Sequence, residues 1–286
     1  MKKLGVVILN YMNYQDTIEC TESFLKQEYP ELEIVIVDNH SDNNSWLVLK
    51  ETFSNNSKVR LLKAKSNLGF ARGNNLGIRY ARRKLGCDAV FVINSDTRLL
   101  SKDVCMQMME QCEENVGVIN PVCIGLDGEW QRPYGRFTEN LIIETLRVLF
   151  NIFSGTFQNI FKIRYGVTDS MGTYDINALV DNGYVIQGSA YILTPEFFKH
   201  YNQLYPKTFL YGEELNLAWY LKKAGLRTVV VDSARILHKE AGSTEFTGIE
   251  RSMRKFKFQM SSFLKSLPVF VLNYNEIVRK YNKLRK

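Results

Sequence analysis

The strongest structural signal in the chain is Ala89-Val-Phe-Val-Ile-Asn-Ser-Asp-Thr97. Its consecutive apolar residues, Val90 to Ile93, predict a strand that is buried on both faces. The strand ends abruptly at a polar cluster that contains one carboxylate, Asp96. Ligands of open α/β sheets bind just beyond the carboxyl ends of the strands. The cluster is therefore either a place where a divalent cation meets a diphosphate or an ordinary Asx turn.

Strand-like and helix-like segments alternate on both sides of this stretch. Apolar runs predict strands at residues 4–9, 33–38, 59–64, 89–93, 116–122, 185–193 and 227–231. Helical periodicity predicts helices at residues 16–27, 46–53, 73–85, 103–113, 213–224, 247–264 and 269–283, and a further one from Pro195. Strands separated by helices form βαβ units. We therefore expect an α/β fold with a mainly parallel central sheet flanked by helices, followed by C-terminal helices.

Residues 141–161 interrupt this alternation, because they are rich in Leu, Ile and Phe at helical spacing and carry few charges. A helix in the core is the simplest interpretation. The alternatives are an insert that covers the active site, holds a second substrate or contacts a membrane.

The composition is that of an ordinary globular protein, with 45% hydrophobic and 23% charged residues among 286. The five cysteines are odd in number and show no C-x-x-C spacing, which indicates reduced thiols in a cytoplasmic protein. The apolar run after Met1 is too short for a secretory signal, and no apolar stretch is long enough to span a bilayer.

The net charge of +7 is concentrated in the C-terminal segment. Residues 251–286 carry ten Lys or Arg and one acid, or +9, whereas the rest of the chain sums to −2. Such a tail either binds anionic lipid, at about 1 kcal/mol per basic residue near the surface, or forms a solvated helix face. We expect no nucleic-acid partner, and peripheral contact with the inner face of the cell membrane stays open.

Polar residues follow several of the predicted strands, notably Asn10-Tyr11, Asp38-Asn39 and the cluster ending at Asp96. In a parallel sheet these strand ends meet at one edge. Asp38 supplies an acceptor-only carboxylate, which suits the donors of a nucleobase imide or a ribose hydroxyl. The alternative is an N-cap or Asx turn.

The segment Asn67-Leu-Gly-Phe-Ala-Arg-Gly-Asn-Asn75 contains two glycines, an arginine and the predicted start of a helix. In kind it resembles a phosphate or nucleotide cradle. It is neither a G-x-G-x-x-G fingerprint nor a Walker A loop.

Taken together and in this order, the motifs resemble the family 2 glycosyltransferases, most closely their rhamnosyltransferase-like branch. The resemblance covers about residues 4–240. It implies the GT-A fold and an inverting, nucleotide-sugar-dependent enzyme of bacterial surface polysaccharide synthesis. It also implies that residues 1–122 bind the donor and that residues 123–240 bind the acceptor and catalyse. The charge distribution and the helical pattern add a basic helical extension at 241–286. The donor is then a UDP- or dTDP-linked sugar, and the acceptor a glycan or a lipid-linked oligosaccharide.

The resemblance assigns roles in nucleotide-sugar binding to two groups of residues. The first would line the nucleobase and ribose pocket: Asn10, Tyr11, Asp38 and Asn39. The second would shape the nucleotide-sugar loop: Asn67, Gly69, Arg72, Gly73 and Asn74.

The resemblance also implies a metal site. Asn94-Ser95-Asp96 matches the Asp-x-Asp motif that holds Mg²⁺ or Mn²⁺ on the diphosphate, with Asn in place of the first Asp. Asp96 is then the main protein anion, and oxygen ligands suit these hard cations. His238 matches a histidine that completes the metal shell, and its alternative is a plain polar loop residue.

The expected general base is Glu214, because Glu213-Glu214 matches the acidic pair of the family. Glu213 and Gly188 would contact the nucleotide sugar. Asn216 replaces the last acid of the family pattern, so it receives no role. The alternative for the glutamates is an acidic first helical turn that complements the helix dipole.

Two other functions remain open from the residues alone. A nucleotidyltransferase acting on sugar phosphates would need a Gly-rich loop with Lys or Arg directly after the first strand, and residues 10–14 contain none. A non-catalytic carbohydrate-binding protein would have no need of the acids at Asp96 and Glu214.

Overall fold

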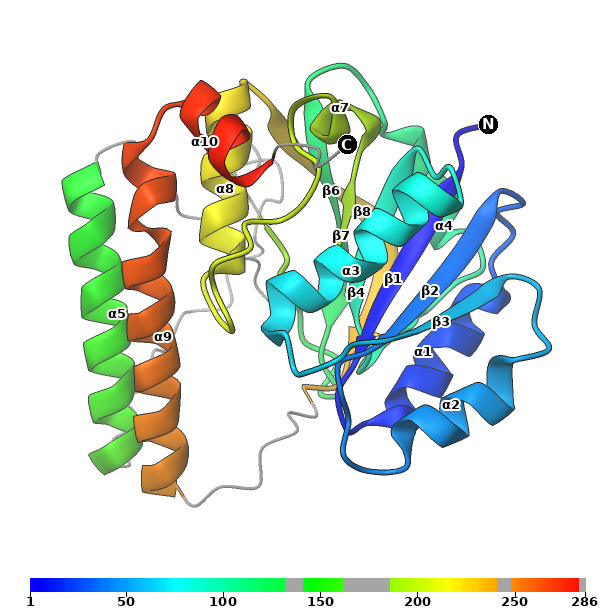
Figure 1. Ribbon diagram of the computed structural model, residues 1–286, viewed down its shortest axis with the longest axis horizontal. Helices are drawn as coiled ribbons and strands as arrows, with labels where there is room; N and C mark the ends of the chain where they lie inside the picture. Colours follow the sequence, from blue (N-terminus) through cyan, green and yellow to red (C-terminus); the bar gives the residue numbers. More distant parts are fainter. Residues whose placement is uncertain (132–140, 162–185, 241–247, 283–286) are drawn as a thin grey trace.

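The computed structural model describes residues 1–131, 141–161, 186–240 and 248–282. Its centre is an eight-stranded sheet in the order β3-β2-β1-β4-β7-β6-β8-β5, with helices on both faces (Figure 1). The strands are β1 (Leu4–Asn10), β2 (Leu32–Asp38), β3 (Val59–Lys63), β4 (Ala89–Asn94), β5 (Thr97–Leu99), β6 (Val116–Ile124), β7 (Ala190–Leu193) and β8 (Arg227–His238).

The first three helices connect the parallel strands of the first half, and most helices of the second half gather at the side of the molecule remote from β3 (Figure 1). They are α1 (Tyr14–Leu25), α2 (Ser45–Phe53), α3 (Gly69–Lys84), α4 (Val104–Glu110), α5 (Leu141–Phe161), α7 (Pro195–His200), α8 (Glu213–Ala224), α9 (Gly248–Val271) and α10 (Tyr274–Tyr281).

The sheet is mainly parallel, as the alternation of strands and helices predicts. β1, β2, β3 and β4 pair in parallel, and so do β6 and β8. β7 is antiparallel to both of its neighbours, β4 and β6, and β5 is antiparallel to β8. The parallel part requires helical crossovers, which is why α1, α2 and α3 follow its strands.

Two hydrophobic clusters cover the two faces of the sheet. Val7 of β1 and Val92 of β4 point into one cluster, with α3 and α8. Ile8 and Ile93 point into the other cluster, with α1 and α4. Successive residues of a strand face opposite sides, so a strand buried on both faces has the continuous apolar run that the sequence contains.

The structure contains one strand that was not predicted and extends another. β5 follows Asp96 directly and has only three residues, which is too short for a periodic signal. β8 continues to His238, seven residues beyond the predicted end, because its second half pairs with β5 and β6. Part of the strand predicted at residues 185–193 forms β7, and residue 185 lies outside the described residues.

The predicted break at Pro268 is wrong. α9 continues through Pro268 to Val271, and the chain turns at Asn273 instead. The Asn273 side chain accepts a hydrogen bond from Glu276 N at 3.0 Å, and Glu276 Oε2 accepts one from Asn273 N at 2.9 Å. This reciprocal capping box starts α10 and fixes the boundary.

The prediction of a core helix at residues 141–161 is also wrong. α5 packs along α9 at the side of the molecule remote from β3 (Figure 1). Ile152 is buried there, whereas Leu146 and Phe150 are 62% and 70% exposed. Among the described residues, no helix has the length and apolar character needed to cross a membrane.

Candidate active site

Three parallel strands end side by side in polar residues. Asn10 at the end of β1 lies across from Asp38 at the end of β2. Asn94 at the end of β4 lies across from Leu9 of β1. The expected meeting of these strand ends at one edge is confirmed, and we refer to it as the carboxyl edge of the sheet.

Asp38 and Asn10 are completely buried and bonded to each other. Asn10 Nδ2 donates to Asp38 Oδ1 at 2.8 Å, and Ser41 N donates to Asp38 Oδ2 at 3.3 Å. Thr17 Oγ1 donates to Asn10 Oδ1 at 2.9 Å. Asn10 therefore positions Asp38, and Tyr11 beyond it is partly exposed. Direct contact of these residues with a nucleobase or ribose stays a prediction.

The loop predicted from Asn67 to Asn75 is shorter than expected, because α3 begins at Gly69 and not near Gly73. Gly73 and Asn74 are buried within this helix, and Arg72 is exposed. A Cβ at Gly73 would lie 2.6 Å from a side chain of β1. Gly73 therefore permits close packing of α3 on the sheet, and a role of these residues in donor binding stays a prediction.

Asn39 holds the turn that enters α3. Its buried side chain donates to Asn67 Oδ1 at 3.1 Å and to Gly69 O at 3.3 Å, and it accepts from Leu68 N at 2.9 Å. Gly69 has a φ of +74°, and a Cβ there would lie 2.3 Å from Phe209 O. Only glycine fits this position. The turn is thus fixed to the carboxyl edge at Asn39.

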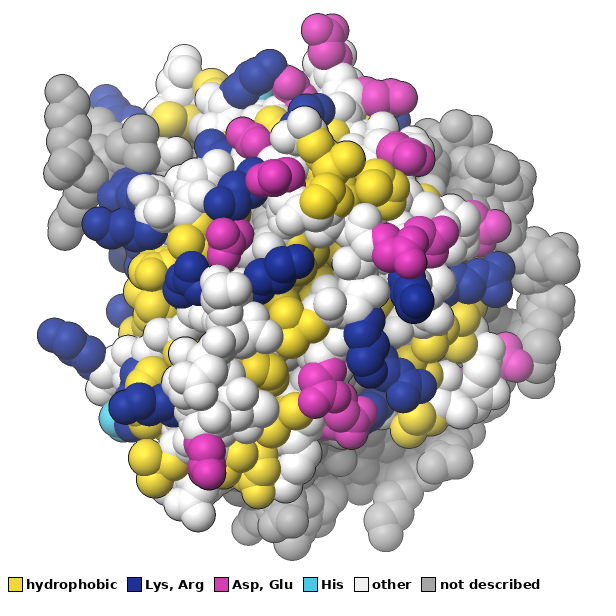
Figure 2. All heavy atoms as spheres, turned by 90° about the vertical axis from the view of Figure 1, so that its right-hand side faces the viewer, with side chains coloured by type: hydrophobic (Ala, Val, Ile, Leu, Met, Phe, Trp, Pro, Cys, Tyr) yellow, Lys and Arg dark blue, Asp and Glu magenta, His cyan; other side chains and the backbone are white. Residues whose placement is uncertain are grey.

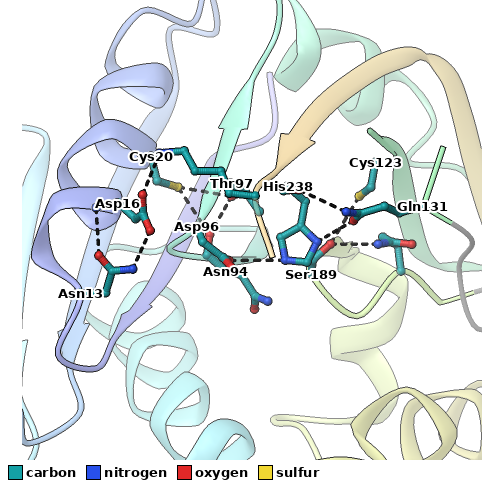
Figure 3. A network of polar contacts seen from close by, with 12 residues as sticks. Asn13, Asp16, Cys20, Asn94, Asp96, Thr97, Cys123, Gln131, Ser189 and His238 are labelled. Atoms are coloured by element: carbon teal, nitrogen blue, oxygen red, sulfur yellow. Dashed lines mark hydrogen bonds and ion pairs between the residues drawn. The ribbon is translucent and has the colours of Figure 1, made fainter. Parts of the chain in front are cut away.

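Asp96 and His238, the predicted metal ligands, lie next to each other (Figure 3). His238 Nε2 is 3.4 Å from Asp96 Oδ1. His238 Nδ1 is 2.6 Å from Gln131 Oε1, and Gln131 Nε2 donates to His238 O at 3.1 Å. Because an amide oxygen only accepts, Nδ1 carries a hydrogen toward Gln131, and Nε2 is the ring nitrogen that faces Asp96. Asn94 and Ser95, which precede Asp96, are partly exposed.

β5 sets this contact. Thr97 pairs with His238 across the antiparallel ladder, and Lys239 N donates to Asp96 O at 2.9 Å. Lys239 Nζ also lies 2.7 Å from a carboxylate oxygen of Asp16 on α1. The end of β8 is therefore held against both β5 and α1, and His238 cannot shift without breaking these contacts.

Glu213 and Glu214 form the first turn of α8, after Gly212 in the left-handed conformation at a φ of 82°. Carboxylates at this end of a helix interact favourably with its dipole. A Cβ at Gly188 would lie 1.9 Å from Glu214 Oε1. The carboxyl group of Glu214 thus occupies the space that a side chain at residue 188 would need.

Burial raises the pKa of both carboxyl groups, although each glutamate retains some exposed surface. For Glu213, burial is the largest cause and the charge of Glu214 the second, and its pKa is about 8. Among the described residues, Glu213 Oε1 is buried without a hydrogen-bond partner. Two adjacent carboxylates repel each other, so we infer that Glu213 keeps its proton while Glu214 ionises first.

A backbone hydrogen bond joins the two parts of the site. Asn94 N donates to Ser189 O at 2.8 Å, and Ser189 follows Gly188 directly. The turn that leads to Asp96 and the space filled by Glu214 therefore meet where β4 and β7 pair. The carboxyl edge therefore holds an acidic site with two parts. In one part the Nε2 nitrogen of His238 lies beside Asp96, and in the other the carboxyl group of Glu214 can accept a proton.

Two residues of this site carried no signal in the sequence. Gln131 fixes the His238 ring but lies 107 residues from it and belongs to no motif. Lys239 neutralises acids of α1 more than 200 residues away. Only the path of the folded chain brings such pairs together.

Residues 5–174 match the model of the family described as Glycosyl transferase family 2, which is more than half of the chain. The chain therefore belongs to glycosyl transferase family 2. Its fold is GT-A-like: it resembles the crystal structure of S. aureus TarS 1–349 in complex with UDP-GlcNAc, with a TM-score of 0.56 and 16% identity. This match covers 98% of the chain and 73% of that structure.

Three curated relatives are similar over shorter regions. They are the glycosyltransferase GlyG of Streptococcus pneumoniae (27% identity, 39% of this chain, 35% of the relative), the low-salt glycan biosynthesis hexosyltransferase Agl10 of Haloferax volcanii (26%, 44% and 38%) and the dTDP-rhamnosyl transferase RfbF of Shigella flexneri (27%, 40% and 37%). The matched region spans little more than a third of each relative.

We expect the free energy of unfolding to fall as the pH rises from about 5 to about 8. Folded Glu213 stays protonated up to its pKa of about 8, whereas unfolded Glu213 ionises near 4.5, so unfolding releases a proton between these values. The loss is at most about 1.4 kcal/mol per pH unit for this group. Urea denaturation at several pH values measures it.

Glu213→Gln should reduce this pH dependence, because residue 213 then has no proton to release and only the part due to Glu214 remains. Glu110→Gln, at an exposed position of α4, is the matched control and should keep the slope of the wild type. A slope that survives unchanged in Glu213→Gln would contradict the raised pKa.

Proposed function

We propose that this chain is an inverting glycosyltransferase that uses Glu214 as its general base. The observation that carries the proposal is the position of the Glu214 carboxyl group against Gly188, at the same sheet edge as the Asp96–His238 pair. Sugar transfer from a nucleoside diphosphate needs two groups. One is a carboxylate that can accept a proton, and the other is a pair of side chains, here Asp96 and His238, that can bind a cation.

The donor that we propose is a UDP- or dTDP-linked hexose or deoxyhexose. The TarS structure contains UDP-GlcNAc, and RfbF is named as a dTDP-rhamnosyl transferase, which supports both nucleotides. We propose a glycan or a lipid-linked oligosaccharide as acceptor, in surface polysaccharide synthesis on the cytoplasmic side of the membrane. Residues 1–122 would bind the donor, residues 123–240 the acceptor, and residues 241–286 form the basic extension.

In the proposed reaction, Glu214 removes the proton from an acceptor hydroxyl. The hydroxyl oxygen then attacks the anomeric carbon on the face opposite the diphosphate, which leaves with the bonding electron pair. The N-terminus of α8 favours the ionised form of Glu214 and so opposes the effect of burial on its pKa. Glu213 retains its proton and adds no second charge. No covalent intermediate forms, so no nucleophilic Ser or Cys is required.

The residues around Asp96 fit a divalent cation. Carboxylate oxygen and neutral imidazole nitrogen are both ligands of Mn²⁺, and Mg²⁺ prefers the oxygen. Gln131 orients the His238 ring as a second ligand shell does. Within the described residues no group of three His, Cys, Asp or Glu side chains gathers, so donor oxygens would supply the remaining ligands. The cation would neutralise the leaving diphosphate.

The two alternatives predict other features. A nucleotidyltransferase needs a basic, Gly-rich loop after β1, whereas residues 11–13 are Tyr, Met and Asn, and Asn13 directly caps α1. A carbohydrate-binding protein without catalysis does not need a glutamate with a raised pKa beside a second one. We therefore favour transfer over both.

Glu214→Gln should lower kcat by about 10²- to 10⁴-fold, because the amide cannot accept the acceptor proton. The dissociation constant of the nucleotide sugar should change only a few-fold, since the substitution keeps the size of the side chain. Initial rates and calorimetric donor binding measure the two effects. Glu110→Gln serves as the control, and transfer at the wild-type rate in Glu214→Gln would remove this residue from the mechanism.

Asp96→Ala and His238→Ala should each weaken Mn²⁺ binding, and Gln131→Ala should do so by about 10- to 100-fold because the ring loses its orientation. Calorimetric titration with Mn²⁺ and UDP measures this effect. His200→Ala is the control, because His200 bonds to Tyr274 and not to this site. Equal Mn²⁺ affinity in all four variants would exclude the proposed metal ligands.

A further inference from the structure

α5 and α9 together present a row of apolar side chains to solvent. On α5, Leu146, Phe150 and Phe153 are 62%, 70% and 55% exposed. On α9, Leu264 and Val271 are 56% and 70% exposed. We call these residues, together with Met253 and Leu267 of α9, the apolar ridge.

The ridge is one continuous face of each helix. The spacing of Leu146, Phe150 and Phe153 by four and three residues places them on one side of α5. Val148 and Ile152 lie on the opposite side and join the hydrophobic cluster that covers α8 and α10. α5 is therefore apolar on both sides, and within the described part of the chain the side with Val148 and Ile152 joins the hydrophobic cluster.

The two helices pack closely enough for the ridge to be shared. Phe153 of α5 contacts Phe256 of α9, with ring centroids 5.5 Å apart. The helices lie side by side at one end of the molecule, away from β2 and β3 (Figure 1). A planar partner can therefore touch both helices at once.

The charges that accompany the ridge are mainly basic. Arg254, Lys257 and Lys265 of α9 are exposed. Over their full lengths, α5 and α9 contain six Lys or Arg and two Glu. The opposite end of the molecule differs, because acidic and basic side chains are interspersed there (Figure 2). An apolar face with a basic border is typical of helices that lie in the interface of an anionic bilayer.

We propose that the apolar ridge docks this protein on an anionic lipid bilayer, with α5 and α9 lying in the interface. None of the described helices can span a membrane, so the contact is interfacial. A second copy of the chain fits less well, because a self-complementary interface would bring the basic residues of two α9 helices together. The inference is independent of the reaction that the protein catalyses.

The structure also separates the basic residues of the C-terminal segment into two groups. Arg279 and Lys280 of α10 line a groove together with Arg79 and Arg83 of α3, outside the ridge. The membrane contact should therefore depend on the charges of α9 and not on those of α10. This distinguishes the ridge from a tail that binds lipid by charge alone.

The test is co-sedimentation of the full chain with vesicles of phosphatidylglycerol and phosphatidylcholine, compared with phosphatidylcholine alone. The wild type should bind the anionic vesicles more strongly. Leu146→Ser/Phe150→Ser should lower the partition coefficient by more than about tenfold, because two large apolar side chains no longer enter the lipid. Leu47→Ser/Leu126→Ser, at exposed leucines outside the ridge, is the matched control and should bind like the wild type.

Charge reversal gives a second comparison at equal net charge. Lys257→Glu/Lys265→Glu should weaken binding to anionic vesicles, and Arg279→Glu/Lys280→Glu should weaken it much less. If Leu146→Ser/Phe150→Ser loses its fold, the variant Phe150→Trp is used in its place. The fluorescence of the added tryptophan should shift to the blue when anionic vesicles are present. The proposal is overturned if the wild type does not bind, if the ridge variants bind equally, or if the ridge instead mediates self-association in light scattering without lipid.

Discussion

The carboxyl group of Glu214 has its position only because residue 188 has no side chain. A Cβ at Gly188 would lie 1.9 Å from Glu214 Oε1, so the two cannot occupy this space together. Gly188 leads into β7, and β7 pairs with β4. Because Asp96 follows the end of β4, this pairing fixes the distance between Glu214 and the turn that bears Asp96. The placement of this carboxyl group therefore depends on an antiparallel strand within a mainly parallel sheet.

The same arrangement explains why the site lies at one edge of the sheet. The parallel half of the sheet directs Asn10, Asp38 and Asn94 to the carboxyl edge. The second half returns along β7 and β8 and adds Glu214 and His238 at that edge. A rigid sheet, buried on both faces, thus holds carboxylates that would repel each other, and it maintains the raised pKa of Glu213.

Much of this could be predicted from the sequence, for specific physical reasons. Buried parallel strands leave long apolar runs, so β1, β2 and β4 were evident, and their polar ends indicated the carboxyl edge. The family resemblance gave Asp96, His238 and Glu214 as candidates. Gln131 could not be predicted, because its contact with His238 joins distant parts of the chain. The apolar pattern of α5 does not distinguish a core helix from a helix with an exposed apolar side. Pro268 indicated a helix break, but tertiary packing carries α9 through this residue and the chain breaks at the Asn273 cap.

Turnover by Gly188→Ala shows whether the position of Glu214 against residue 188 matters for the reaction. The new methyl group should displace the flexible end of Glu214 and leave the fold intact, as thermal unfolding would verify. We expect a fall in kcat of at least about 100-fold, as for a misplaced general base. Turnover at the wild-type rate in a folded variant would contradict it, because the position of Glu214 against residue 188 would then be irrelevant to the reaction.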